Sequence, residues 1–470
     1  MNGSLKKDKR NPQRITDIGL TQDSLTSRAG LSLFVRYLSG IHLYTELSNR
    51  FGRIRKSSKG QEVTEIFKQI LCFLFDGTSR HLTYFDHLKK DEGYAKGIES
   101  GVDDLVSSHG IKRFFYAFSW PLIWIFRTVL RQLFLWRLNI VHPDVIIIDV
   151  DSMVMDNDTA QKRHGVQPTY KKKKGFHPIQ MTWSRFIVDA VFQGGKKHCN
   201  HGDSVARMIK HVVADIRIHY RWNVPIIFSF DSGYFDQKLL SLCEALKVGY
   251  VCGGKLYKDV KHYLSSVDES CFRRYDKVGQ TWDYFEFGDK AGSWTKYRRA
   301  IFCRPRYEDR QSLLEFARPD SLIYTNLGMG QPIDDQLRAV GKEEYIKAEG
   351  GIALYHGRGR NELVNRSFKD FGFEELPFKR FAPNAALYYV MLLGFFLFES
   401  FKEDVLSGEL PLACYATTLR RRLVDLAGKI VRTGGKTILK FSKAAWASLD
   451  LRALWERSGC PPKIVWDPCF

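Results

Sequence analysis

The chain has 470 residues, and 72 Lys and Arg against 52 Asp and Glu leave a formal net charge of +20. This length excludes a small module, is sufficient for a large buried core and suggests two to four domains. A composition of 44% hydrophobic and 26% charged residues is typical of a globular protein. Because surplus positive charge costs self-repulsion, we expect a polyanionic partner, with nucleic acid ahead of a membrane surface and a generic basic protein as the alternative.

The nine cysteines predict neither a disulfide framework nor a zinc ribbon, because they are odd in number, scattered and free of any Cys-x-x-Cys pair. The first residues, which include "KKDKR", do not resemble a signal peptide. Two apolar stretches are predicted to be buried helices rather than membrane spans. Residues 114–136 contain Pro121, Arg127 and Arg131, and residues 385–398 are shorter than the ~20 residues that a span requires. We therefore expect a reduced, cytoplasmic protein with no membrane partner.

Residues 1–140 are predicted to form a basic arm followed by an α-helical domain. The arm covers about 15 polar and basic residues that could lie on DNA. Apolar residues then recur at three and four spacing in "LSLFVRYLSGIHLYTELSNRF" and "VTEIFKQILCFLF", which indicates amphipathic helices. A basic helical domain of this kind suits DNA binding, although helical bundles serve many other roles.

Residues 141–254 change to an alternation of strands and helices. "VIIIDVDSMV", "FHPIQMTW" and "RFIVDAVF" predict three strands that can pair as a meander. A helix over 204–220, the strand "VPIIFSFD", the helix "FDQKLLSLCEALK" and the strand "VGYVCG" follow. This order predicts a mixed sheet with helices on both faces.

The pattern of apolar and polar residues divides the remaining chain into three parts. Residues 255–349 contain aromatic, period-two stretches such as "TWDYFEF" and predict a β-rich insertion. Residues 350–410 return to helix and include the apolar helix 385–400. The C-terminal region, 411–470, contains a predicted strand pair, "KIVRTGGKTILKFS", and a closing helix near 444–457.

One predicted helix, "YHGRGRNELVNRSFKDF", carries a polar stripe. At 100° per residue Tyr355, Arg358, Glu362 and Lys369 share an arc of about 60°. Apolar side chains lie on the opposite side, so the stripe is predicted to face outward or into a cleft. A surface ion pair between Arg358 and Glu362 is the simpler interpretation.

Carboxylates at predicted strand ends suggest a metal site. Asp149 and Asp151 end one strand on the same face, and Asp231 ends "VPIIFSFD". Side chains at the ends of neighbouring strands gather where open sheets bind ligands. With Glu362 they would form a set of hard oxygen ligands suited to Mg²⁺, and two such ions support phosphodiester cleavage and strand transfer. A turn-forming or helix-capping role is the alternative for Asp231.

These residues carry a family resemblance. The spacing Tyr-x2-Arg-x3-Glu-x6-Lys, held by Tyr355, Arg358, Glu362 and Lys369, resembles the YREK signature of DDE transposases from bacterial insertion sequences. "IIIDVDS", "YKKKKGFHP", "FDSGYF", "WTKYRRAIF", "YTNL" and "YHGRGRNE" resemble, in order, blocks of the group-one transposase DDE domain. The resemblance covers roughly residues 20–460. It implies an RNase H-like core with a β-rich insertion between the second Asp and the Glu.

The resemblance also implies residue roles. Asp231 and Glu362 would be the second and third catalytic carboxylates and metal ligands, and the first would be Asp151 or Asp149. "DSMV" departs from the commoner "DAT" or "DST" at that point. Tyr355, Arg358 and Lys369 would contact the DNA backbone beside the scissile phosphate. The basic loop is also expected to bind DNA, a solvated loop being the alternative, and it consists of Lys171, Lys172, Lys173 and Lys174.

The expected function is therefore transposition. The protein would bind the terminal inverted repeats of an insertion sequence, cleave DNA there and join the ends to target DNA. Its expected cofactor is Mg²⁺, with Mn²⁺ as a substitute, and its partner is double-stranded DNA, on which it would assemble as a homodimer at the bacterial nucleoid. A catalytically inactive DNA-binding descendant and a cellular RNase H-like nuclease are the alternatives.

Overall fold

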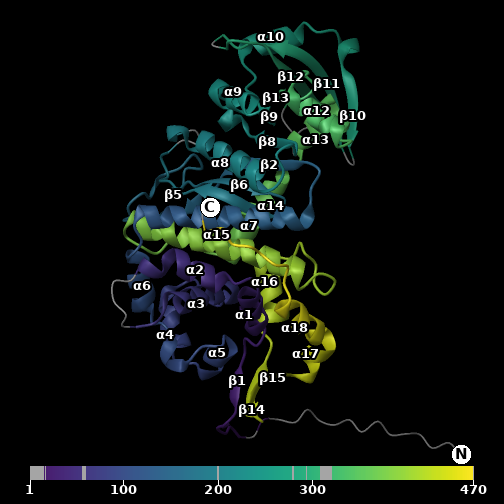
Figure 1. Cartoon of the computed structure of the whole chain (residues 1–470). Helices are drawn as coiled ribbons and strands as arrows, with labels where there is room; N and C mark the ends of the chain where they lie inside the picture. The colour runs from purple at the N-terminus through teal and green to yellow at the C-terminus, as the bar shows by residue number, and fades with distance from the viewer. Residues whose placement is uncertain are drawn as a thin grey trace, which may run out of the picture.

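The computed structural model describes residues 15, 17–54, 60–197, 201–277, 280–292, 294–306, 320–468 and 470. Residues 1–14, which make up most of the predicted basic arm, lie outside this set. Within the described residues, one large mixed sheet occupies the upper part of Figure 1, two long helices cross the middle, and a helical layer with a small hairpin lies below them.

The large sheet has nine strands in the order β10-β11-β12-β13-β9-β8-β2-β6-β7. The five strands at the β7 end arise from the segment predicted to form the mixed sheet, and all five predicted strands are confirmed. They are β2 (Ile146–Ser152), β6 (Ile179–Trp183), β7 (Phe186–Val191), β8 (Ile226–Phe230) and β9 (Gly249–Gly253).

The pairing of these five strands defines the fold. β2, β6 and β7 form an antiparallel meander, whereas β2 pairs with β8, and β8 with β9, in parallel. Helices α8 (Ser204–His219) and α9 (Gln237–Ala245) supply the connections that parallel pairing requires. The order β7-β6-β2-β8-β9, with three antiparallel strands followed by two parallel ones, is that of an RNase H-like core, which confirms the predicted fold class.

The β-rich segment after β9 extends the same sheet. β13 (Ser321–Thr325) pairs antiparallel with β9, and β12 (Arg298–Arg306) and β11 (Gln280–Asp289) continue outward to β10 (Arg273–Lys277). Helices α10 (Lys258–Ser265) and α12 (Pro332–Ala339) accompany these strands. The insertion is therefore continuous with the core through the ladder of β9 and β13.

Helices cover both faces of the sheet, because apolar side chains of the central strands point alternately to one face and the other. In β2, the side chains of Ile146, Ile148 and Val150 belong to a buried cluster shared with α15 (Phe381–Asp404). Ile147 points to the other face and packs with a second cluster that includes Ile352 of α13 (Ala348–His356). Asp149 and Asp151 follow Ile147 in the alternation, so they lie on the α13 side of the sheet.

The long apolar helix α15 is part of the protein core. It packs beside α7 (Trp120–Val141), and the two helices lie side by side in Figure 1. Among the described residues, α15 is the one helix long and apolar enough to cross a membrane, yet 89% of its most apolar window is buried inside the protein. Its composition is therefore explained by the core that it fills, as the sequence predicts.

The first six helices and the C-terminal helices form the lower layer of Figure 1. Buried side chains from Leu31 through Leu454 belong to one continuous hydrophobic cluster, which crosses the predicted boundary at residue 140. The bounds in this layer are α1 (Leu31–Gly40), α2 (Leu43–Phe51), α3 (Val63–Asp76), α4 (Phe85–Leu88), α5 (Glu92–Gly97), α6 (Ser108–Tyr116), α16 (Ala416–Leu419), α17 (Lys443–Ser448) and α18 (Leu451–Gly459).

Two smaller sheets complete the chain. β1 (Ser24–Thr26), β14 (Gly428–Thr433) and β15 (Lys436–Phe441) form one, so the predicted C-terminal strand pair is confirmed. β3 (Met155–Asp156), β4 (Gln167–Pro168) and β5 (Lys174–Phe176) form the other, directly after β2.

Two helix predictions are wrong in detail. The single helix predicted from Tyr355 to Phe371 is divided into α13, which ends at His356, and α14 (Gly359–Phe371). At this step the amides of Arg358, Arg360 and Asn361 donate to carbonyls three residues earlier, so the chain tightens for one turn. The predicted closing helix is likewise divided into α17 and α18.

Candidate active site

The register of the two central parallel strands places two aspartates side by side. Asp149 of β2 lies opposite Ser229 of β8, and Val150 lies opposite Phe230. Asp151 follows Val150, and Asp231 follows Phe230. These two carboxylates therefore meet at the carboxyl ends of adjacent strands. In chain order the strands are separated by a meander and a helix, and the parallel pairing brings them together.

Hydrogen bonds orient both carboxylates. Asp151 accepts from the backbone amide of Ser152 at 2.8 Å and from Nδ2 of Asn365 at 3.3 Å. Asp231 accepts from the backbone amide of Gly233 at 2.9 Å, which caps a short helical turn. The capping role that the sequence left open for Asp231 is thus present, and it occupies one carboxylate oxygen.

The environment of Asp151 disfavours its negative charge. Burial raises the pKa of Asp151 above its ordinary value; the Arg358 guanidinium opposes this shift and the negative charge of Asp231 adds to it. Two carboxylates that crowd each other at a partly buried sheet edge are a donor set that a divalent cation would stabilise.

Asp149 has a different partner. Its Oδ1 lies 3.9 Å from Nη1 of Arg358, within the range of an ion pair. Burial raises the pKa of Asp149, and the Arg358 guanidinium acts against that rise. The Arg358 guanidinium thus acts on both carboxylates, and it is Asp149 that lies within ion-pair distance of it, whereas Asp151 also has Asp231 as a neighbour.

Arg358 connects the start of α14 to the sheet. Its guanidinium donates to Oγ of Ser229 and to the carbonyl of Val150, both at 3.2 Å, and 13% of its side chain is exposed. These bonds join the step between α13 and α14 to β2 and β8. In this structure Arg358 is thus a tertiary link as well as a cation beside the carboxylates.

Glu362 lies in the first turn of α14 and is exposed. An acidic residue there is favoured by the helix dipole. Among the residues that the structure describes, no three His, Cys, Asp or Glu side chains are grouped closely enough to hold a metal ion. The strands bring Asp151 and Asp231 together, but Glu362 does not complete a three-carboxylate group with them. The donor set therefore fits a divalent cation through two of its three predicted ligands.

Tyr355 and Lys369 make contacts within the protein. A Cβ atom at Gly253 would lie only 2.4 Å from the hydroxyl of Tyr355, so a glycine at the end of β9 provides the space for this ring. Lys369 forms an ion pair with Glu374. The Tyr355 hydroxyl and the Lys369 ammonium group therefore both contact other protein groups.

The lysine loop borders the aspartate pair. All four of its lysines are exposed. Lys171 is close enough for its charge to lower the pKa of Asp151. Nζ of Lys173 lies 3.3 Å from Asp156 and 3.2 Å from Asp158, and Nζ of Lys174 donates to Gln161 at 2.7 Å. Part of the loop's charge is therefore neutralised locally, next to the site.

Sequence reasoning missed Asn365, the α14 side chain that contacts Asp151. Asn365 follows Arg358 by seven residues and Glu362 by three, so at 100° per residue it lies about 20° from Arg358, at the edge of the polar stripe. Its position on that face could have indicated a role, but an uncharged asparagine does not stand out among the polar residues of a helix.

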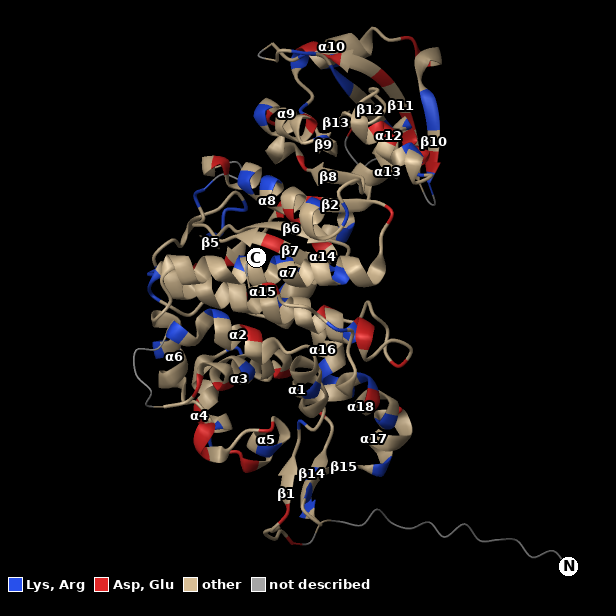
Figure 2. Cartoon of the chain, in the orientation of Figure 1, with Lys and Arg blue, Asp and Glu red and all other residues tan. Residues whose placement is uncertain are grey.

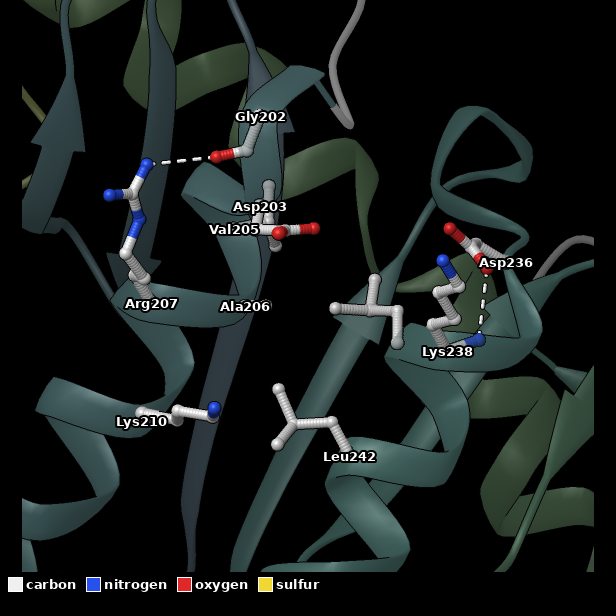
Figure 3. A pocket seen from close by; sticks show the side chains of 10 residues that line it. Gly202, Asp203, Val205, Ala206, Arg207, Lys210, Asp236, Lys238 and Leu242 are labelled. Carbon is white, nitrogen blue, oxygen red and sulfur yellow. Dashed lines mark hydrogen bonds between the residues drawn. The ribbon is translucent and has the colours of Figure 1, made fainter.

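The pockets of the described residues differ in their relation to the predicted site. One, of about 490 Å³, lies between α8 and α9, and basic side chains of Arg207, Lys210 and Lys238 reach it. In Figure 3, Arg207 donates to the carbonyl of Gly202, and the amide of Lys238 donates to Asp236. This pocket contains none of the predicted site residues. A second pocket, of about 710 Å³, includes Asp149 in its lining.

A comparison with protein families identifies the class of this chain. The sequence model of a family described as transposase DDE domain group 1 matches residues 15–457. No curated protein matches the chain. Among solved structures, a piggyBac transposase in a synaptic complex with hairpin DNA matches over 86% of this chain and 82% of that chain, with 11% identity and a TM-score of 0.38. At that TM-score, the fold assignment rests on the strand order described above.

Proposed function

The chain belongs to the transposase DDE domain group 1 family, and from this premise we propose that it moves an insertion sequence. It would bind the terminal inverted repeats, cleave DNA at the element ends and join them to target DNA. The family uses divalent metal ions and catalyses cleavage and transfer of DNA strands.

The observation that carries this proposal is the pairing of Asp151 with Asp231. The parallel register of β2 and β8 places both residues at one sheet edge, and α14 is attached to the same edge through Arg358 and Asn365. We assign Asp151, Asp231 and Glu362 as the metal ligands. Asp149 is assigned as the counter-charge of Arg358, because its carboxylate lies within ion-pair distance of that guanidinium.

The proposed cofactor is Mg²⁺, and Mn²⁺ should replace it because it accepts the same oxygen ligands. When bound, two such ions activate a water or a 3′ hydroxyl and stabilise the leaving oxygen of a phosphodiester. The protein contributes the fixed orientation of Asp151, held by Ser152 and Asn365, and that of Asp231, held by Gly233. Glu362 must approach these two residues to complete the set, and we place that approach in the DNA-bound state.

The DNA backbone is the proposed partner of Tyr355, Arg358, Lys369 and the lysine loop. Arg358 bonds to Ser229 and Val150, and Lys369 pairs with Glu374, so phosphates would replace or share these protein partners. Charged hydrogen bonds to phosphate are strong enough for such an exchange. We further propose that two copies assemble on the DNA, and that the protein acts in the cytoplasm at the nucleoid.

A catalytically inactive DNA-binding descendant is the second candidate. It is favoured by the position of Glu362, which does not join Asp151 and Asp231 in one group among the described residues. A cellular RNase H-like nuclease is less well supported, because the family match extends through the insertion and α14.

A nicking assay on the DNA that flanks the gene tests the proposal. The full-length protein is incubated with that DNA and Mg²⁺, with Mn²⁺, or with EDTA, and the broken strands are mapped. We expect cuts at the borders of short inverted repeats with either metal and none with EDTA. Binding to these borders without cleavage in any metal would favour the inactive descendant, and cleavage of RNA–DNA hybrids without preference for the borders would favour the nuclease.

A further inference from the structure

The β14–β15 hairpin extends beyond the strand that supports it. Its six residue pairs run from Gly428 opposite Phe441 to Thr433 opposite Lys436. β1 pairs only with Gly428 through Ile430, so the outer half of the hairpin is a ribbon of two strands. The ribbon closes at Gly434 and Gly435, whose φ values of 55° and 73° lie in the left-handed region that suits a tight hairpin turn. Figure 1 shows it at the lower end of the molecule.

This ribbon is exposed and carries positive charge. Every residue from Arg432 to Ile438 is exposed. The hairpin contains four basic residues and no acidic residue between 428 and 441, and Figure 2 shows blue segments on it. The basic residues are Lys429, Arg432, Lys436 and Lys440.

Three of these four basic side chains have no counter-charge among the residues that the structure describes. Lys429 lies directly opposite Lys440, an arrangement of like charges that destabilises a strand pair. Asp23 lies 2.9 Å from Lys429 and offsets the charge at the base. Within the described part of the chain, Arg432, Lys436 and Lys440 form no ion pair. The unbound ribbon therefore carries a repulsion that a polyanion would relieve.

The shape of the ribbon fits a groove of double-stranded DNA. The major groove is about 12 Å wide and 8.5 Å deep and admits a two-stranded β-ribbon. Three residues on each strand, Val431 to Thr433 and Lys436 to Ile438, extend beyond β1, which at about 3.3 Å per residue is roughly 10 Å. The length that extends beyond β1 thus matches the depth of the groove.

The side chains at the tip suit contacts with DNA. Arg432 lies opposite Thr437, and Thr433 lies opposite Lys436, so each basic side chain is paired with a hydroxyl across the ribbon. Arg and Lys donate to phosphates and to guanine O6 and N7, and threonine hydroxyls donate or accept at either group.

We propose that the outer half of the β14–β15 hairpin inserts into the major groove of double-stranded DNA. This inference rests on the proposed function, which supplies DNA as the partner. It adds a DNA-contact surface that is separate from Asp151 and Asp231. A competing explanation is that the lysines protect β15, an edge strand, against pairing with other chains.

A matched pair of variants tests the insertion. The double variant Arg432→Ala/Lys436→Ala removes two charges from the ribbon, and Lys258→Ala/Lys261→Ala removes two exposed charges from α10. Affinity for the DNA that flanks the gene is measured over a range of salt concentrations. We expect the ribbon variant to bind ten- to hundredfold more weakly and to lose about 1.8 from the log-log salt slope, at roughly 0.9 per phosphate contact. The α10 variant should stay within about threefold of the parent protein.

Protection of guanine N7 from methylation identifies the groove. The parent protein should protect a short run of guanines that the ribbon variant leaves reactive, while both proteins have the same circular dichroism spectrum and melting temperature. Equal weakening by both variants, or unchanged protection, would overturn the proposal. Normal DNA binding with increased aggregation of the ribbon variant would also overturn it and favour edge protection. In those outcomes, cleavage of this DNA by the parent protein would still support the proposed function. Failure of the parent protein to bind this DNA would reject the proposed function itself.

Discussion

The ends of β2 and β8 differ from the α13–α14 segment in how their functional side chains are held. At the strand ends, backbone pairing sets the positions of Asp151 and Asp231, and backbone amides orient their oxygens. In the α13–α14 segment, Arg358 and Lys369 are engaged with other protein groups and Glu362 is exposed. In the proposed site, the sheet would therefore supply a preformed pair of carboxylates, while the third would come from a helix whose contacts DNA is expected to change.

The largest effect is expected at the strand ends. Asp231→Asn and Asp151→Asn should each lower the Mg²⁺-dependent cleavage rate by roughly a thousandfold or more, because one altered ligand affects both nucleophile activation and leaving-group stabilisation. Single-turnover cleavage of the flanking DNA measures the loss, and filter binding checks that the DNA is still bound.

Asp149→Asn is the matched control for these variants. It lies on the same strand and face, but its partner is Arg358, so we expect a loss of only a few fold. A loss at Asp149 as severe as that at Asp231, together with mild loss at Asp151, would reverse the assignment of the first ligand.

Arg358→Ala should give the next largest effect and tests whether α14 is held by the sheet. It removes hydrogen bonds to Ser229 and Val150, and a charged hydrogen bond contributes about 1.5–3 kcal/mol. We expect a lower free energy of unfolding in urea and cleavage reduced about ten- to hundredfold. Arg358→Lys should recover part of the stability. Slower cleavage with unchanged stability would show that Arg358 acts on DNA alone.

Asn365→Ala sharpens the comparison at a single contact. The amide of Asn365 is the link from α14 to the carboxylate of Asp151, so its removal should leave Asp151 less well oriented. We expect a rate loss of about tenfold, the size of one hydrogen bond of about 1.4 kcal/mol. The Mg²⁺ concentration for half-maximal cleavage should rise, and Mn²⁺ titration followed by electron paramagnetic resonance should show weaker binding. Unchanged metal binding would show that Asn365 does not orient Asp151 as a metal ligand.

Lys369→Ala is expected to have the smallest effect on the folded protein. Its pair with Glu374 is partly exposed, and such pairs contribute less than about 1 kcal/mol to stability. If phosphate becomes its partner, cleavage should fall more than stability does. Thermal unfolding and single-turnover rates of Lys369→Ala and Glu374→Gln separate the two roles, since only the lysine variant should slow cleavage.

Much of the fold was predictable from sequence because the strands are short apolar runs. The β-branched run around residues 146–150 and the apolar run around Ile226–Phe230 predict buried strands, and strand periodicity places Asp149 and Asp151 on one face. The sequence could not give the register between β2 and β8, which is what distinguishes the two aspartates. That register is set by tertiary pairing of residues about 80 positions apart.

Helical periodicity was less reliable at the stripe. The pattern of Tyr355, Arg358, Glu362 and Lys369 fits one helix, but Gly357 and Gly359 flank the point where the helix divides. Glycine lowers the helical stability of this step, and the bonds of Arg358 to the sheet hold it there. Asn365 could not be singled out, because its importance comes only from its proximity to Asp151.

Cleavage by Glu362→Ala tests the central claim most directly, because Glu362 is the proposed ligand that stands apart from Asp151 and Asp231. The variant is compared with the parent protein for Mg²⁺-dependent cleavage at the element end, with DNA binding and circular dichroism measured on the same samples. The proposed site predicts a folded protein that binds the end and does not cut it. Normal cleavage by folded Glu362→Ala protein would contradict the three-carboxylate assignment.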